Sequence, residues 1–479
     1  MSQARTFVPL GPEDSAILAL ESQTVVGHTC KIVRLGQGAP SVEELRARIA
    51  ERIELAPALT RRLEGEPGSY GWAPDPEFDI ARHVVPAPVG GESEIGRDSD
   101  NGGASWDGGG GKGLSENSPD RPQRAPEAPS ASFRTVSKGR DGGTHGVANP
   151  LDQDGLRAVV AELFERHLER DRPLWRMDVV ELDDAGKAIV WRIHHALADG
   201  ITSMRYASTL LWDDSPELRA TPNERARSHE RDERRRVGHL AGFLRREFRP
   251  RRSPFDGEIG TRREVAFSSV SLRELRRASR ALAQATINDA VLSVLAGSLS
   301  EWVREHHGHT GNVRVRVPVS LHHEGEDAAN HDSYFSVGLP LYERDPVARL
   351  RIVHQRTTDR KSAHDAEHMD VLLHELSEVS PRLQRFCARV QSSPREFALC
   401  VSNVPGPRES VHVLDASVRT IHSLAEIGQH HALRVSVISL AGSLCFGFCA
   451  DPGLVDGVQG MADGVVTQAR ELIRAVQEV

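Results

Sequence analysis

Two adjacent histidines, followed by an aspartate and a glycine, form the stretch of this sequence with the clearest capacity for chemistry. His194, His195, Asp199 and Gly200 occur within WRIHHALADG, where an alternating apolar run gives way to a helical pattern. A neutral imidazole near pH 7 is a natural general base, contributing about 10²–10⁴-fold to a reaction rate. We expect Asp199 to fix the loop by bonding to the backbone or to an arginine. We expect Gly200 to adopt a conformation closed to other residues.

A shared metal ion is an alternative role for the histidine pair. Adjacent residues on an extended chain point to opposite faces, so His194 and His195 cannot easily bind one ion. Zinc would also need further Cys, His or carboxylate ligands at suitable spacing, and the sequence has none nearby. The same alternation suits a division of labour, in which one histidine faces the core and the other faces a cleft. We therefore predict no metal site.

A bare histidine pair means little in a chain with 22 histidines. Three other pairs lack Asp-Gly at the right spacing, at 306–307, 322–323 and 430–431. Nucleophilic serine catalysis is the competing enzyme hypothesis, but the sequence has no Gly-x-Ser-x-Gly elbow, and Ser402 has no partner visible from the sequence. The Asp-Gly that follows the pair therefore distinguishes His194–His195 from the other histidine pairs. Because the serine alternative lacks support, direct transfer by a general base is favoured.

Predicted strands and helices place the motif in a strand-to-helix loop, where binding and catalytic residues often lie. PLWRMDVVEL and KAIVWRI predict two strands joined by the turn DDAG, and ITSMRYASTLLW predicts the following helix. Upstream, HTCKIVRL predicts a strand. Ser41 and Glu44 form a capping-box signature ahead of another helix.

The second half of the chain repeats this mixture. TINDAVLSVLAGSLSEWV predicts a helix, VRVRVPVSL and ALCVSNVPGP predict strands, and a hairpin turns around Ala441–Gly442. A last helix is expected in LVDGVQGMADGVVTQARELIRAV. Mixed helices and strands in both halves predict two α/β-type layers that face each other.

Composition limits the class of protein. With 479 residues, two domains are the default, and the formal net charge of −8 argues against nucleic-acid binding. The N-terminus has no signal-peptide pattern, and no stretch approaches the ~20 apolar residues that span a bilayer. We expect a cytosolic protein that at most contacts the inner face of a membrane or a lipid body. The five cysteines are scattered without a Cys-x-x-Cys pair, which favours core packing over a disulfide framework: Cys30, Cys387, Cys400, Cys445 and Cys449.

Two polar segments divide the chain. Residues 89–148 are rich in Gly, Ser, Pro and Asp, which predicts a disordered surface insert. Residues 216–263 are basic and contain VGHLAGFLRREF, with Phe243 and Phe248 at helical spacing. This helix fits either an interdomain linker packed on its own protein, which we favour, or a contact with anionic lipid. The predicted domains are therefore 1–215 and 264–479, joined by a linker at 216–263.

With the motif placed, the chain resembles the bacterial wax ester synthase/acyl-CoA:diacylglycerol acyltransferase family of the CoA-dependent acyltransferase superfamily. His-His-x-x-x-Asp-Gly is shared across the superfamily, whereas four further blocks point to this family. They are the Pro-Leu-Trp block (Pro173, Leu174 and Trp175), the Asn-Asp block (Asn288 and Asp289), SNVPGP at 402–407, which contains Asn403, and the ending FGFCADPGLV. Two stretches depart from the family pattern, FDGEIG at 255–260 and the surroundings of Asn330, and these put substrate choice in doubt more than reaction type.

The resemblance implies a two-domain α/β sandwich of chloramphenicol-acetyltransferase-like domains, with the active site at their interface. It implies that His195 is the general base that activates an acceptor hydroxyl toward an acyl-CoA thioester, without an acyl-enzyme and without a cofactor. His194, Asp199 and Gly200 would then support the loop. The expected partners are acyl-CoA and either diacylglycerol or a long-chain alcohol.

The family blocks have two interpretations. Pro173, Leu174, Trp175, Asn288, Asp289 and Asn403 either bind substrate or only stabilise the fold, and the structural interpretation is slightly favoured for each. Two other functions remain open: a condensation enzyme of specialised metabolism with a carrier-protein donor, and a silent lipid-binding homologue. The SNVPGP block and the stand-alone length favour the acyltransferase over the first of these, and the intact motif argues against the second.

Overall fold

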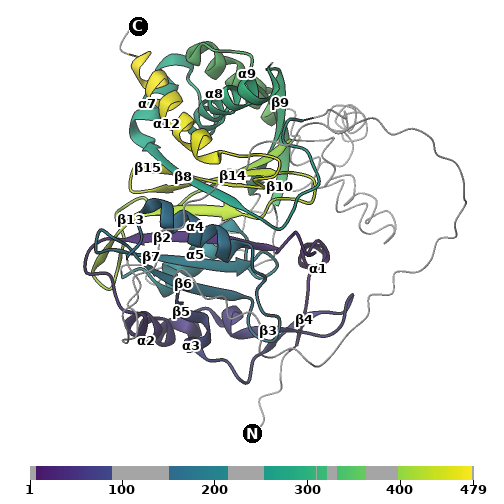
Figure 1. The fold of residues 1–479 in the computed structure, drawn as a ribbon, viewed down its shortest axis with the longest axis vertical. Helices are drawn as coiled ribbons and strands as arrows, with labels where there is room; N and C mark the ends of the chain where they lie inside the picture. The colour runs from purple at the N-terminus through teal and green to yellow at the C-terminus, as the bar shows by residue number, and fades with distance from the viewer. Residues whose placement is uncertain are drawn as a thin grey trace, which may run out of the picture. The chain divides into compact units, whose positions relative to one another are not determined.

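The computed structural model describes residues 7–88, 150–213, 253–308, 310–320, 332–362 and 398–476. Within these ranges the chain forms two six-stranded sheets and one three-stranded sheet, with helices packed against them (Figure 1). The expected mixed α/β class is therefore present. The predicted insert at 89–148 and the predicted basic helix at 237–248 lie outside the described residues.

One six-stranded sheet carries the histidine motif. Its strands, in spatial order, are β12 (His412–Val413), β13 (Ala416–Ala425), β2 (His28–Leu35), β7 (Lys187–His194), β6 (Trp175–Glu181) and β5 (Val84–Pro86). The predicted strands β2, β6 and β7 are confirmed, and β7 is antiparallel to both of its neighbours. Both faces of these central strands are covered, so that nearly every residue of β2 and β7 is buried, including the charged Lys31 and Arg192.

Sheet membership crosses the predicted domain boundary. Strand β13 belongs to the C-terminal half of the sequence, yet it pairs with β2 through Ile421–Val33 and the neighbouring register positions. Figure 1 shows the yellow-green β13 beside the purple β2. The sheet that carries the motif is therefore built from both halves of the sequence.

The second six-stranded sheet is formed by the C-terminal half. Its strands, in spatial order, are β10 (Asp332–Pro340), β9 (Asn312–Ser320), β11 (Leu399–Val404), β14 (Leu433–Leu440), β15 (Ser443–Ala450) and β8 (Glu264–Ser271). The predicted hairpin is confirmed, because β14 and β15 are joined by Ala441 (φ 46°) and Gly442 (φ 89°). Two positive φ angles are typical of the two-residue turn that matches the twist of antiparallel strands.

Helices pack against the second sheet through their apolar faces. The helices on the second sheet lie together in Figure 1 and are α7 (Leu272–Ala283), α8 (Ile287–His307), α9 (Pro346–Ser362) and α12 (Val458–Arg474). The predicted helix α8 is buried on nearly all sides, since α7, α9 and α12 all pack against it. The last helix begins at Val458, later than the sequence pattern suggested, because residues 452–455 form turns.

The motif-bearing sheet has its own helical cover. The helices are α2 (Val42–Arg52), α3 (Ile80–His83), α4 (Gln153–Phe164) and α5 (Gly200–Leu210), with the short helices η1 (Ile53–Leu55) and η2 (Pro57–Thr60). The predicted capping box is present at the start of α2, where Ser41 and Glu44 bond reciprocally. Helix α4 contacts β8 of the second sheet, so it packs between elements of the two halves.

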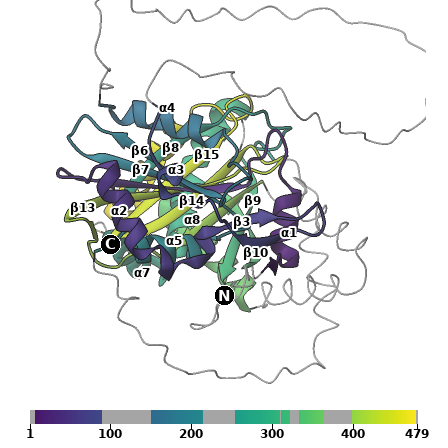
Figure 2. The same ribbon diagram turned by 90° about the horizontal axis from the view of Figure 1, so that it is seen from below.

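A small sheet and the first helix lie against the motif loop. The sheet contains β1 (Val8–Pro9), β4 (Gly71–Pro74) and β3 (Arg61–Glu64), and the helix is α1 (Pro12–Ala19). Leu18 of α1, Leu63 of β3 and Ala196 of the motif form one apolar cluster. Figure 2 shows α1 close to β3, in agreement with this cluster.

Among the described residues, no single helix is long and apolar enough to span a bilayer. Helices α7 and α8 reach that length and apolar composition only when taken together, and a bend of 94° separates them.

Candidate active site

The motif occupies the loop between β7 and α5, as predicted. Neighbouring segments hold its backbone on both sides of the strand end. The N–H of His194 donates to the carbonyl oxygen of Leu174 at 2.9 Å, and the N–H of His195 donates to the carbonyl oxygen of Gly27 at 2.9 Å. The N–H of Ala198 then turns back to the carbonyl oxygen of His194 at 3.1 Å. Backbone hydrogen bonds therefore anchor both histidines independently of their side chains.

The His194 side chain is buried and engaged at both ring nitrogens. Its Nδ1 accepts the N–H of Ala196 at 3.1 Å, and its Nε2 lies 3.0 Å from Oε1 of Glu21. Because Nδ1 accepts, Nε2 carries the proton and donates it to the carboxylate. Burial raises the pKa of Glu21, but the hydrogen bonds and charges of His194 and Arg170 outweigh it, so that the pKa lies below its ordinary value. These contacts fit the expected role of His194 as loop support.

Gly27 allows this arrangement because it lacks a side chain. Its φ is +71°, in the left-handed region that favours glycine. A Cβ at this position would lie 2.6 Å from Nε2 of His194 and 2.9 Å from Cγ of Glu21. The conformation of Gly27 and the packing of the His194–Glu21 pair thus require glycine for two separate reasons.

His195 differs from its neighbour in exposure. His194 is 1% exposed, whereas His195 is partly exposed, so the two neighbours differ in their access to solvent. Burial and the charge of Arg434 lower the pKa of His195 to about 4, and the charge of Asp199 opposes this shift. The imidazole is therefore neutral at pH 7 and can accept a proton.

Within the described ranges, no group of three or more His, Cys, Asp or Glu side chains could hold a metal ion.

Asp199 acts on the backbone of α5. It is buried and occupies the N-cap position, where its Oδ1 accepts the N–H of Thr202 at 2.6 Å. Of the two roles expected for this carboxylate, the structure shows bonding to backbone.

The conformational reason predicted for Gly200 is wrong. Gly200 is the first residue of α5 and does not have a positive φ. The restriction is one of space, because a Cβ would lie 2.9 Å from Cγ2 of Val404. A helix start needs no left-handed residue, but close packing at this start leaves no room for a side chain.

This contact brings the SNVPGP block to the motif. Val404 is the last residue of β11, and it packs in the same apolar cluster as Ala198 and Met204. The block then turns away, with the N–H of Gly406 donating to Oγ of Ser439 at 3.0 Å. Asn403 lies half-buried on β11, one residue before the contact with Gly200.

The Pro-Leu-Trp block lies at the start of β6, beside the end of β7 that carries His194. Pro173, Leu174 and Trp175 are buried, and the Leu174 carbonyl oxygen accepts the His194 N–H. Trp175 donates its indole N–H to the carbonyl oxygen of Leu59 at 2.8 Å. These contacts support the structural interpretation of the block.

The Asn-Asp block has its contacts in the helical layer. Asp289 at the start of α8 accepts from Oγ1 of Thr357 at 2.6 Å and lies 2.9 Å from Nδ1 of His354, both on α9. It also completes a capping box with Thr286. Asn288 is half-buried on the same turn. The contacts of Asp289 therefore join α8 to α9 and do not reach the histidine loop.

Sequence reasoning missed several residues around the loop. Glu21 and Gly27 carried no signal, because their partners lie far away in the sequence. Lys31 did carry one, since a lysine inside the apolar strand pattern HTCKIVRL indicates a buried polar group. Lys31 is buried in β2 and donates to Oγ of Ser423 at 2.7 Å, and burial lowers its pKa to about 8.

Comparison with known proteins connects this geometry with a family. The profile of the wax ester synthase/diacylglycerol acyltransferase catalytic domain matches residues 145–247, and that of the WS/DGAT C-terminal domain matches residues 328–472. Together these matches cover more than half of the chain. A relative from Mycobacterium tuberculosis, named probable diacylglycerol O-acyltransferase, is 23% identical over 469 residues, which cover 91% of this chain and 89% of the relative. A second relative of the same name and organism is 27% identical over 355 residues, covering 67% and 78%.

Solved structures share the fold. The wax ester synthase/diacylglycerol acyltransferase from Marinobacter aquaeolei VT8 superimposes with a TM-score of 0.64 at 18% identity, over 98% of this chain and 100% of that one. A mutant of the starter condensation domain of rhizomide synthetase, in complex with C8-CoA, gives a TM-score of 0.56 at 12% identity, over 99% of this chain and 94% of that one. The expected fold class is thereby confirmed. The chain belongs to the wax ester synthase/diacylglycerol acyltransferase family and is an acyltransferase.

Proposed function

We propose that this acyltransferase moves a long-chain acyl group from acyl-CoA to the hydroxyl of diacylglycerol or of a long-chain alcohol. The products would be triacylglycerol and wax ester. The names of the relatives support this acceptor class. The observation that carries the proposal is the partly exposed His195, whose imidazole is neutral at pH 7 and whose loop is held through Leu174 and Gly27.

The proposed reaction is a direct transfer. His195 takes the proton from the acceptor hydroxyl as its oxygen attacks the thioester carbonyl carbon. A tetrahedral intermediate forms, and its collapse breaks the carbon–sulfur bond. The imidazolium then returns its proton to the departing CoA thiolate, so that the histidine ends the cycle neutral. No covalent enzyme intermediate forms, and no cofactor takes part.

The surrounding residues have supporting roles in this proposal. His194, Asp199 and Gly200 hold the loop through the contacts described above. Asn403 remains a candidate for substrate contact, because its neighbour Val404 touches Gly200. The contacts of Leu174 are those of a scaffold residue.

We also propose that the protein works in the cytoplasm and contacts a membrane or lipid-body surface peripherally, because both proposed acceptors reside in lipid. The segment of the sequence that would make this contact is 237–248, which carries Phe243 and Phe248 and for which the linker interpretation is the favoured alternative. Co-sedimentation with anionic liposomes tests this contact. A double variant with Phe243→Ser and Phe248→Ser should bind less, and equal binding would remove this part of the proposal.

Thiol release tests the reaction directly. Purified protein is incubated with palmitoyl-CoA and either diacylglycerol or hexadecanol, and free CoA is followed with a thiol reagent. His195→Ala should abolish acceptor-dependent release because the base is lost. His412→Ala, which changes an exposed histidine on β12, is the matched control and should retain activity. Turnover that survives His195→Ala would refute the mechanism.

A further inference from the structure

A buried ion pair outside the motif contacts the segment that precedes β2. Arg263 lies just before β8 and Glu426 just after β13, and their side chains are 1% and 8% exposed. Nη2 of Arg263 lies 3.1 Å from Oε1 of Glu426. Both residues come from the C-terminal half of the sequence, and no role in the reaction has been given to either.

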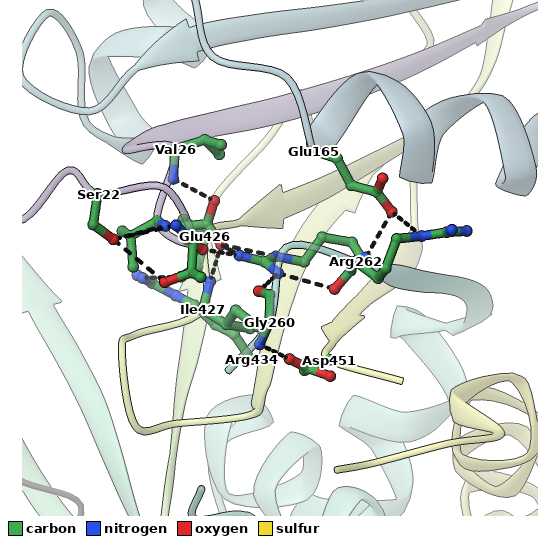
Figure 3. A network of polar contacts seen from close by, with 12 residues as sticks. Ser22, Val26, Glu165, Gly260, Arg262, Glu426, Ile427, Arg434 and Asp451 are labelled. Carbon is green, nitrogen blue, oxygen red and sulfur yellow. Dashed lines mark hydrogen bonds and ion pairs between the residues drawn. The ribbon is translucent and has the colours of Figure 1, made fainter. Parts of the chain in front are cut away.

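The carboxylate of Glu426 is fully engaged. Its Oε1 accepts Nε–H of Arg263 at 3.1 Å and the N–H of Ile427 at 2.9 Å. Its Oε2 accepts the N–H of Val26 at 3.2 Å. Figure 3 shows Glu426 between Val26 and Ile427, with these contacts dashed. One oxygen therefore binds the C-terminal half, and the other binds the N-terminal half.

Arg263 contacts the same segment. Its Nη2 donates to the carbonyl oxygen of Thr24, and its Nη1 donates to the carbonyl oxygens of Gly260 at 2.8 Å and Arg262 at 2.9 Å. The two members of the ion pair thus hold the backbone on either side of Val25. Such a buried pair is maintained at a desolvation penalty, and removing one partner leaves an uncompensated charge.

The segment held in this way leads directly to the histidines. Gly27 follows Val26, and its carbonyl oxygen accepts the N–H of His195. Gly27 also lies close to the His194 ring, because a Cβ at Gly27 would be only 2.6 Å from Nε2 of His194. A shift of the Val26 backbone would therefore move the acceptor that anchors His195.

We propose that Glu426, together with Arg263, is a positioning residue for His195. The pair transmits the placement of the C-terminal half to the catalytic loop through Val26 and Gly27. This inference rests on the proposed role of His195. Its predicted effect is on the geometry of proton transfer, so that kcat falls while the KM for acyl-CoA changes little.

A second ion cluster, more exposed than the Arg263–Glu426 pair, provides a control for the position of the ion pair. Asp184 pairs with Arg34 of β2 at 3.0 Å and with Arg419 of β13 at 2.8 Å, so it also joins the two halves of the sequence. It lies at the opposite end of β2, where Gly186 packs on the Leu35 carbonyl. The length of β2 separates it from the loop by roughly 23 Å at about 3.3 Å per residue. Losing this cluster weakens the contact between β2 and β13, which joins the two halves of the sequence, but it leaves the contacts of Gly27 in place.

The experiment compares Glu426→Gln with Asp184→Asn in the full chain. The readouts are kcat, the KM for palmitoyl-CoA, and hydrogen–deuterium exchange of the peptide that contains the His195 amide. Glu426→Gln should lower kcat by about 10-fold or more, since small misplacements of a catalytic group cost up to ~10²-fold. It should also speed exchange at His195. Asp184→Asn should leave kcat and this exchange unchanged.

Arg263→Lys is the second variant, in case Glu426→Gln does not fold. It keeps the positive charge but loses the Nη2 donor to the carbonyl oxygen of Thr24, so kcat should fall by a smaller factor with faster exchange at His195. Equal losses of kcat in the Glu426 and Asp184 variants would overturn the inference, as would faster exchange with unchanged kcat. If the wild-type chain releases no thiol, the proposed function fails. In that case the anchoring of His195 can still be tested separately. Unchanged hydrogen–deuterium exchange at His195 in both Glu426→Gln and Arg263→Lys would overturn it.

Discussion

Replacement of Gly27 by alanine tests the geometry of the loop most directly. The added Cβ would lie 2.6 Å from Nε2 of His194 and 2.9 Å from Cγ of Glu21, at a residue whose φ is +71°. The change therefore imposes backbone strain and a clash with the pair that orients His194. The clash acts on the His194 side chain, whereas the strain acts on the backbone of the residue whose carbonyl oxygen accepts the His195 N–H.

The two effects have different magnitudes. A non-glycine residue in the left-handed region costs about 1–2 kcal/mol. To restore ordinary contact at 3.4 Å, the His194 ring must move by about 0.8 Å, which breaks or lengthens its bond to Glu21. Displacements near 1 Å at a catalytic site cost up to ~10²-fold in rate, so we expect Gly27→Ala to lower kcat by ~10- to 100-fold.

Gly38→Ala separates strain from clash. Gly38 has a similar φ of +77°, and a Cβ there would meet nothing within 4 Å. Urea denaturation should show a comparable loss from backbone strain in both variants, about 1–2 kcal/mol in the free energy of unfolding, whereas only Gly27→Ala should lose kcat. The assay is acyl-CoA-dependent thiol release. Equal kcat values for the two variants would refute the claim that the His194–Glu21 pair positions the loop.

Three further predictions concern the same loop. Burial lowers the pKa of His195 to about 4, so the neutral base persists as pH falls, and the acid limb of kcat/KM should lie well below the ordinary value near 6.5. A limb near 6.5, with the fold intact by circular dichroism, would contradict this. Glu21→Gln replaces a charged acceptor of His194 by a neutral one, a loss of about 1 kcal/mol, so steady-state kcat should fall about 5-fold with KM unchanged. Gly200→Ala meets Cγ2 of Val404 and should destabilise the fold by about 1–3 kcal/mol in urea denaturation, and Val404→Ala in the same chain should relieve part of that loss.

Local patterns in the sequence were sufficient for the elements around the motif. The alternation in KAIVWRI predicted β7, the turn chemistry predicted its hairpin with β6, and Ser41 with Glu44 marked the start of α2. Each of these signals involves residues that interact within a few positions, so a single sequence contains them. The order His-His-x-x-x-Asp-Gly likewise placed the loop and, through the family blocks, its chemistry.

Only the tertiary structure decided what surrounds that loop. Glu21 is 173 residues from His194, and Val26 is 400 residues from Glu426, so no local period relates them. The close packing that requires glycine at position 200 was missed for the same reason, because Val404 comes from the other half of the chain. Pairing of β13 with β2 brings the C-terminal half onto the motif-bearing sheet, and register between distant strands depends on packing that a local pattern does not encode. The sequence by itself placed the His-His-x-x-x-Asp-Gly loop and predicted His195 as its base, whereas the contacts from Glu21, Gly27 and Val404 depend on distant segments that only the fold brings together.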